Sequence, residues 1–149
     1  MSVLLSGERR LLEGACVEGR RVAEGACRAV LGSLGVVDDR VPGHLGEGDR
    51  VLRRGLRAKS RQLGDAAGSI ELLMAECGFE QWHRLLFARF LAENNLLIHP
   101  VFRAPVTLAE CDELAGEFGE PDGWGVAGRF AADILPGIFR LDDPCVQLR

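Results

Sequence analysis

The stretch that decides the fold is FEQWHRLLFARFLAENNLL, residues 79–97. When it is stepped at about 100° per residue, as in a helix, its large apolar residues fall on one broad stripe. A helix that is apolar over most of its circumference is usually buried between neighbouring elements. The stretch therefore predicts a central, buried helix whose aromatic residues belong to the core. The stripe consists of Phe79, Trp82, Leu86, Phe90 and Leu97, widened by Leu85, Phe87 and Leu91.

Helical signals continue on both sides of this stretch. Residues 6–34, 49–63 and 70–77 show helical periodicity, and Gly78 is expected to end the last of them. Thr107 and Glu110 have the spacing of a capping box before a helix over 108–118, and Asp122 is an N-cap for 124–135. We expect an all-α single domain of about five helices packed around 79–97. Its parts would be an N-terminal helix and flexible loop (1–48), a helical core (49–140) and an exit linker (141–149).

Composition excludes several classes of protein. The chain has 149 residues, 47% of them hydrophobic, which suits one domain with its own core. No apolar run approaches the roughly 18 residues needed to cross a membrane, and the N-terminus does not resemble a signal peptide. We therefore expect a cytoplasmic protein with no membrane partner. The five cysteines include no CxxC pair, and the three histidines are scattered, so we expect buried apolar cysteines and no metal site.

The most informative charge pattern lies in residues 50–61. This segment has six basic residues and no acidic one, inside a chain of net charge −4. On a helix its five arginines fall within about 100° of arc, a geometry suited to contacting successive phosphates. The alternative is a solvated face that pairs with the acidic C-terminal part of the chain. The candidate contacts to DNA phosphates are Arg50, Arg53, Arg54, Arg57 and Arg61.

The region from about residue 50 onward resembles a known protein family. The stretches WHRLLFARFLAENNLL, PVTLAECDELA and PDGWGVAGRFAADILPGIFRLDDP are similar to the helical region before the catalytic domain of PglX-like adenine-specific DNA methyltransferases, found in BREX, DISARM and restriction-modification systems. The resemblance is a helix-packing pattern without a catalytic motif. It implies a module of a phage-defence enzyme that uses S-adenosylmethionine in its catalytic domain. The matching positions are Arg84, Leu85, Arg89, Phe90 and Asn94.

Catalytic motifs are missing from this chain. It has no strand followed by a Gly-rich turn for S-adenosylmethionine and no Asn/Asp-Pro-Pro-aromatic loop for a flipped base; Asp143-Pro144-Cys145 lacks the second proline and the aromatic residue. We therefore expect a non-catalytic helical module that docks on a methyltransferase catalytic domain, in cis or in trans, and contacts the DNA backbone. The alternatives are a stand-alone helical adaptor that binds a protein partner, and a truncated reading frame without a role of its own.

Overall fold

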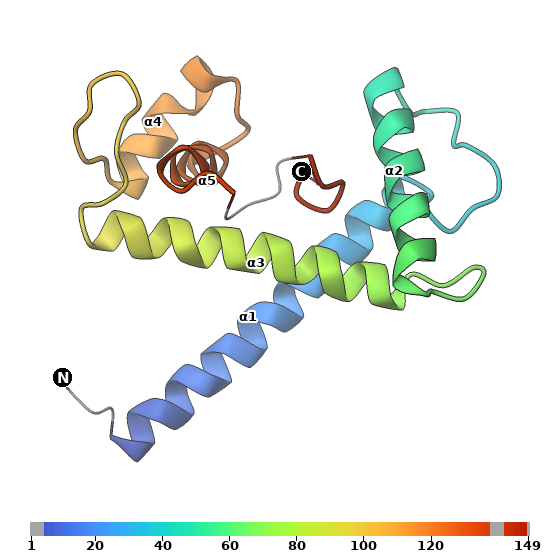
Figure 1. Cartoon of the computed structure of the whole chain (residues 1–149), viewed down its shortest axis with the longest axis horizontal. Helices are drawn as coiled ribbons and strands as arrows, with labels where there is room; N and C mark the ends of the chain where they lie inside the picture. Colours follow the sequence, from blue (N-terminus) through green and yellow to red (C-terminus); the bar gives the residue numbers. More distant parts are fainter. Residues whose placement is uncertain (1–4, 138–141, 149) are drawn as a thin grey trace. The chain divides into compact units, whose positions relative to one another are not determined.

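The computed structural model describes residues 5–137 and 142–148 (Figure 1), and it forms an all-α fold, as predicted. Five helices follow one another along the chain, and the only β-type pairing within the described ranges is an isolated bridge between Ile98 and Pro105. The chain divides into two compact units, which are described separately. The first unit comprises Met1–Trp82 and Asp142–Arg149, and the second comprises His83–Leu141.

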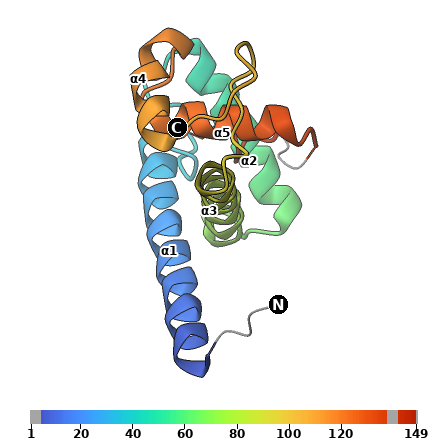
Figure 2. The ribbon, with the colours of Figure 1, turned by 90° about the vertical axis from the view of Figure 1, so that its left-hand side faces the viewer.

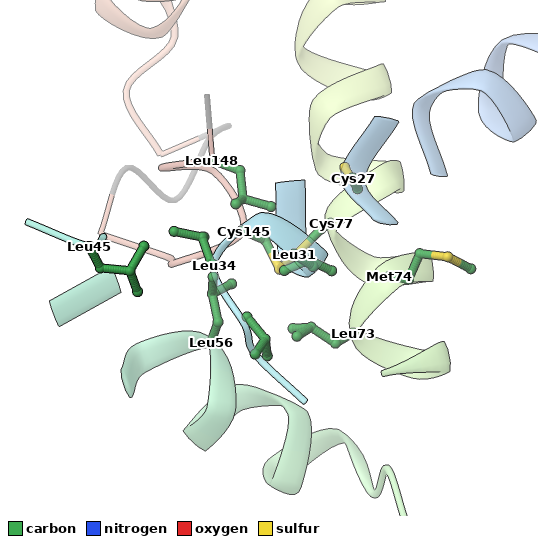
Figure 3. Packing of buried hydrophobic residues seen from close by; sticks show 11 residues of the cluster. Cys27, Leu31, Leu34, Leu45, Leu56, Leu73, Met74, Cys77, Cys145 and Leu148 are labelled. Atoms are coloured by element: carbon green, nitrogen blue, oxygen red, sulfur yellow. A yellow bond between two sulfur atoms is a disulfide. The ribbon is translucent and has the colours of Figure 1, made fainter. Parts of the chain in front are cut away.

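The first unit contains α1 (Ser6–Ser33), α2 (Glu47–Leu63) and the beginning of α3 (Glu71–Glu93). Within the first unit, α1 crosses the beginning of α3 (Figure 1), and the perpendicular view shows the two helices beside each other (Figure 2). Glycines allow the close approach: a Cβ on Gly78 would lie 3.1 Å from the Glu24 Cα atom, and one on Gly19 would meet the Trp82 indole. The core beneath this crossing (Figure 3) is formed by Cys27, Leu31, Leu34, Val36, Leu45, Leu56, Leu73, Met74, Cys77, Cys145 and Leu148.

Two of the predicted helices are in fact one. The sequence predicted a break at Gly78, but α3 runs without interruption through this residue because the small glycine is needed at the contact with α1. The helix also ends at Glu93, earlier than the predicted residue 97. Asn95 adopts a left-handed φ of 57°, and the Leu96 amide donates a hydrogen bond to the Leu91 carbonyl, 2.8 Å away. A residue in this conformation terminates a helix.

The stripe predicted to be the most buried face of α3 is partly exposed. Phe79, Leu86 and Phe90 have 45%, 49% and 55% of their surface accessible. Because α3 is apolar on nearly all sides, its periodicity did not determine which face the neighbouring elements would cover. The covered positions are Leu73, Met74 and Cys77 in the first unit and Ala88 and Leu91 in the second.

The second unit contains the end of α3 with α4 (Leu108–Phe118) and α5 (Gly123–Ile134), which pack against each other. Both predicted caps are confirmed. The Glu110 amide donates to the Thr107 hydroxyl at 3.1 Å, the Thr107 amide donates to the Glu110 carboxylate at 2.7 Å, and the Gly125 amide donates to Asp122 at 3.0 Å. These caps satisfy amides that the first turn of a helix leaves without partners.

The Asp65 side chain caps the beginning of α3. The Asp65 carboxylate accepts hydrogen bonds from the amides of Leu72 and Leu73, at 2.8 and 3.0 Å, and from the Ser60 hydroxyl at 2.6 Å. The hydroxyl of Ser69, just before the helix, accepts a longer hydrogen bond from the Glu71 amide at 3.5 Å. Burial alone would raise the pKa of Asp65, but the hydrogen bonds from Ser60, Leu72 and Leu73 together lower it.

We expect Asp65→Asn to lower the free energy of unfolding at pH 7 by about 1–2 kcal/mol, the usual cost of losing a cap. Because the folded-state pKa of Asp65 is lowered, its stabilisation is present above the unfolded-state pKa of about 3.9 and disappears as the pH falls through the folded-state value. Urea unfolding at pH 7 and at pH 3 measures this difference. The control is Asp39→Asn, which changes an exposed loop carboxylate. Equal losses of unfolding free energy in the two variants would contradict the role of Asp65 as the cap of α3.

Candidate functional site

The five candidate arginines lie on α2, and the structure separates them into two groups. Arg53 belongs to the inner group, with only 4% of its surface exposed. Its Nε atom donates to the Gly35 carbonyl at 3.1 Å, and its Nη2 atom donates to the carbonyls of Asp38 and Arg40. A buried guanidinium requires acceptors for its N–H groups, and here neutral backbone carbonyls supply them. Arg53 therefore holds the loop between α1 and α2.

Two more arginines bind the same loop. Arg57 donates through Nη1 to the Val36 carbonyl at 2.8 Å and to the Asp38 carbonyl, which it shares with Arg53. Arg50 donates through Nε to the Leu45 carbonyl at 3.2 Å. The loop was expected to be flexible, but three guanidiniums of α2 hold its backbone.

Gly35 makes this loop conformation possible. Its φ of +61° lies in the left-handed region, and a Cβ there would approach the Pro42 side chain to 2.5 Å. The turn directs Val36 into the core, where 3% of its surface remains accessible, and Leu45 closes the far end of the loop at 6%. The loop is thus fixed by apolar anchors on one side and by guanidiniums on the other.

Arg54 and Arg61 form the outer group. Both side chains are exposed, and neither makes a hydrogen bond or ion pair to another part of the chain that the structure describes. Within the described residues of the first unit, none of the five α2 arginines lies within 4 Å of a carboxylate. Hydrogen bonds to neutral carbonyls do not cancel a charge, so α2 retains its positive potential.

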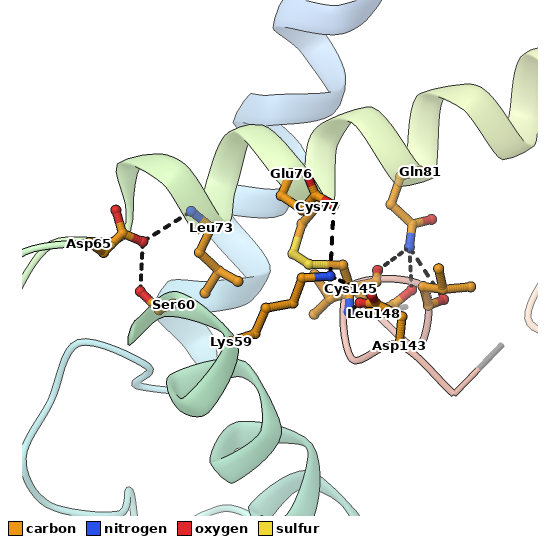
Figure 4. The surroundings of a disulfide bond; sticks show 11 residues. Lys59, Ser60, Asp65, Leu73, Glu76, Cys77, Gln81, Asp143, Cys145 and Leu148 are labelled. Atoms are coloured by element: carbon orange, nitrogen blue, oxygen red, sulfur yellow. Dashed lines mark hydrogen bonds and ion pairs between the residues drawn. A yellow bond between two sulfur atoms is a disulfide. The ribbon is translucent and has the colours of Figure 1, made fainter. Parts of the chain in front are cut away.

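Residues missed by the sequence reasoning lie on the opposite side of α2 (Figure 4). Lys59, the single lysine, forms an ion pair with Asp143 and approaches Glu76 to 3.7 Å. Cys77 of α3 and Cys145 form a disulfide, whereas the cysteines were expected to be mostly small buried apolar residues. The signal for Lys59 was present, because at helical spacing it falls among the leucines of α2 and away from the arginines.

Residues 142–148 also differ from the expected exit linker. Cys145, Val146 and Leu148 are at most 5% exposed, and the Gln81 amide nitrogen donates to the carbonyls of Cys145 and Leu148 at 2.9 and 3.1 Å. The segment is therefore part of the core of the first unit. The predicted boundary at residues 140/141 lies outside the described residues.

In the described part of the chain, no group of three or more His, Cys, Asp or Glu side chains is arranged to hold a metal ion. Within the same ranges, none of the helices combines the length and the apolar character that crossing a membrane requires. With no strand there, the described residues also lack a strand and Gly-rich turn that could hold S-adenosylmethionine. The arginine face of α2 is thus the candidate functional site.

Comparison with known proteins adds no assignment: no family model, curated protein or solved structure matches the chain. The resemblance to PglX-like methyltransferases therefore stays a prediction from the sequence.

The two arginine groups should differ in their effect on stability. We expect Arg53→Met to reduce the free energy of unfolding by about 2–3 kcal/mol, because the carbonyls of Gly35, Asp38 and Arg40 each lose a hydrogen bond from the guanidinium. Arg54→Met, one residue along, removes the same charge from an exposed position and should change stability by less than about 0.5 kcal/mol. Thermal and urea unfolding measure both values. Similar losses of unfolding free energy in the two variants would show that Arg53 and Arg54 do not differ in their contribution to stability.

The free cysteines should react at different rates. Burial raises the pKa of both Cys27 and Cys111 to about 11, and nearby carboxylates add to the effect, whereas Cys16 is partly accessible. Because the thiolate is the reacting species, iodoacetamide at pH 8 should label Cys16 in the folded protein and leave Cys27 and Cys111 unmodified. Peptide mass spectrometry reads the labelled positions. Labelling of all three at similar rates would contradict the burial of Cys27 and Cys111.

Proposed function

We propose that this chain is a non-catalytic helical module that binds a polyanionic backbone through α2. In the role implied by the family resemblance, the polyanion is DNA, and the module belongs to an adenine-specific methyltransferase of a restriction-modification or phage-defence system, beside its catalytic domain. The observation that carries the proposal is the uncompensated charge of α2. Its arginines have no carboxylate partner among the described residues of the first unit, although the chain as a whole is acidic.

Two side chains are best placed to contact phosphates directly. Arg54 and Arg61 are exposed and lie seven residues apart, about two helical turns, so both point to the same side of α2. A guanidinium binds a phosphate through paired, charge-assisted hydrogen bonds. Arg53 and Arg57 support this face indirectly, because they position the loop beside it while adding to the positive potential.

A specific observation favours a second function, that of an adaptor for a protein partner. The N-terminal half of α1 exposes large apolar side chains: Leu11 has 76%, Leu12 54% and Val17 70% of its surface accessible. Apolar groups exposed in such numbers on one helix are typical of surfaces that meet another protein. This function does not require α2 to bind an anion, so a DNA-binding measurement separates the two proposals.

Charge reversal of the outer arginines tests the first function. Arg54→Glu combined with Arg61→Glu should weaken binding to a duplex DNA by at least about tenfold at 0.1 M salt. It should also reduce the slope of log K against log salt by about 2, since two phosphate contacts are lost. Fluorescence anisotropy at several salt concentrations gives both quantities. The control is Arg9→Glu with Arg10→Glu, the same charge change on exposed positions of α1. If the α2 and α1 variants bind alike, α2 is not the DNA-binding face, and the adaptor function becomes the supported one.

A further inference from the structure

Residues 142–148 form a short, non-helical segment that is held in the core of the first unit by several independent contacts (Figure 4). A disulfide joins Cys145 to Cys77 of α3, across a sequence separation of 68 residues. Asp143 pairs with Lys59 of α2, and Pro144 lies against Gly55, where an added Cβ would come within 3.1 Å of the proline ring. The segment thus bridges α2 and α3 through one covalent bond and a few polar contacts.

We propose that this disulfide is a redox latch, which keeps the segment in place when oxidised and lets it leave when reduced. The segment lacks the repeated hydrogen bonds of a helix or strand. Three of its amides, those of Cys145, Val146 and Gln147, all donate to acceptors on a single residue, Asp143. Segments outside regular secondary structure open more easily than the helices around them. The disulfide ties this segment to α3 and therefore restrains its opening.

The chemistry of the latch is a two-electron exchange with a dithiol reductant. A thiolate of the reductant attacks one sulfur of the disulfide, forming a mixed disulfide and releasing the other cysteine as a thiolate. The second thiol of the reductant then attacks the mixed disulfide and releases the remaining cysteine. The protein gains two electrons and two protons, and the dithiol is oxidised to its own disulfide. In a cytoplasmic protein, the compartment expected from the sequence, disulfides are usually transient and redox-sensing.

Access to the sulfur atoms couples the reduction to movement of the segment. Cys77 and Cys145 have no accessible surface, so a reductant reaches the sulfur atoms only during a partial, transient opening of the segment, and reduction then lets the segment leave fully. The Lys59–Asp143 pair opposes this opening. Lys59 and Asp143 are themselves largely covered, with 14% and 10% of their side-chain surface exposed, so water screens their attraction only partly.

Opening would uncover an apolar surface. Cys145 and Leu148 pack in the same cluster as Leu31, Leu56 and Leu73, which are fully buried while the segment is present (Figure 3). Removing the segment exposes part of this cluster between α1, α2 and α3. The reduced state thus presents a binding surface for an apolar probe that the oxidised state lacks.

Hydrogen exchange tests the latch in the wild-type chain. On treatment with dithiothreitol, the amides of Cys145, Val146 and Gln147 should exchange about 30-fold faster or more, the size expected from losing a disulfide restraint. The Cys111 amide, bonded to the Thr107 carbonyl at the start of α4, serves as the internal control and should not change. Unchanged exchange of residues 145–147 in the reduced protein would overturn the proposal. So would an intact-mass measurement that finds five free thiols in the protein purified without reductant.

A pair of variants at neighbouring positions tests the coupling. Asp143→Asn removes the partner of Lys59, and the rate at which dithiothreitol reduces the folded protein should rise by at least about fivefold, because opening is no longer opposed by the ion pair. Asp142→Asn makes the same charge change on an exposed side chain and should leave the rate unchanged. Equal rates for these two variants would show that reduction does not depend on opening of this segment. Cys145→Ser, which lacks the disulfide, should show fast exchange with or without reductant.

Discussion

The first unit depends on how the charge of Arg53 is accommodated inside it. A guanidinium with 4% of its surface exposed requires hydrogen-bond acceptors inside the protein. The Nε and Nη2 atoms of Arg53 donate to the carbonyls of Gly35, Asp38 and Arg40, and Arg57 binds Val36 and Asp38 beside them. The same bonds order a loop that has no secondary structure of its own. Without them, the loop between α1 and α2 would lack partners for much of its backbone, and Val36 and Leu45 would not be held in the core.

The opposite side of α2 is organised by a different set of contacts. There Lys59 forms an ion pair with Asp143, and Pro144 packs against Gly55. The disulfide joins the same segment, residues 142–148, to α3. On one side of α2, arginines donate hydrogen bonds to the carbonyls of the loop between α1 and α2. On the other side, a single lysine contacts residues 142–148. This separation leaves Arg54 and Arg61 exposed, with no carboxylate partner among the described residues of the first unit. A stable helix can present such charges only if its other faces supply enough packing, and Leu56, which is fully buried, provides it.

The sequence predicted the helical architecture well because its signals were local. The capping box of Thr107 and Glu110, the cap at Asp122 and the periodicity of α1 and α2 all depend on residues a few positions apart. The failures concern contacts between distant residues. Gly78 looked like a helix end because its contact with Glu24 of α1 is invisible to a local pattern, and the stripe of Phe79, Leu86 and Phe90 carried no sign of which face would be covered. The pairing of Cys77 with Cys145 could not be deduced from spacing. Within the arginine stripe, however, Arg53 is the arginine closest to the leucine face, a usable signal that it would turn inward.

The α2 arginines divide into those that bind the loop and those that face outward. The most direct test of this division is to measure, by nuclear magnetic resonance, how fast the arginine Nε–H groups exchange with solvent. Arg53 and Arg50, whose Nε atoms donate to carbonyls at 3.1 and 3.2 Å, should exchange slowly, with Arg53 the slower because it is buried. Arg54 and Arg61 should exchange as fast as arginines in an unfolded peptide. Slow exchange at Arg53 together with fast exchange at Arg54 and Arg61 is the predicted result, and equally fast exchange at all four would contradict the account.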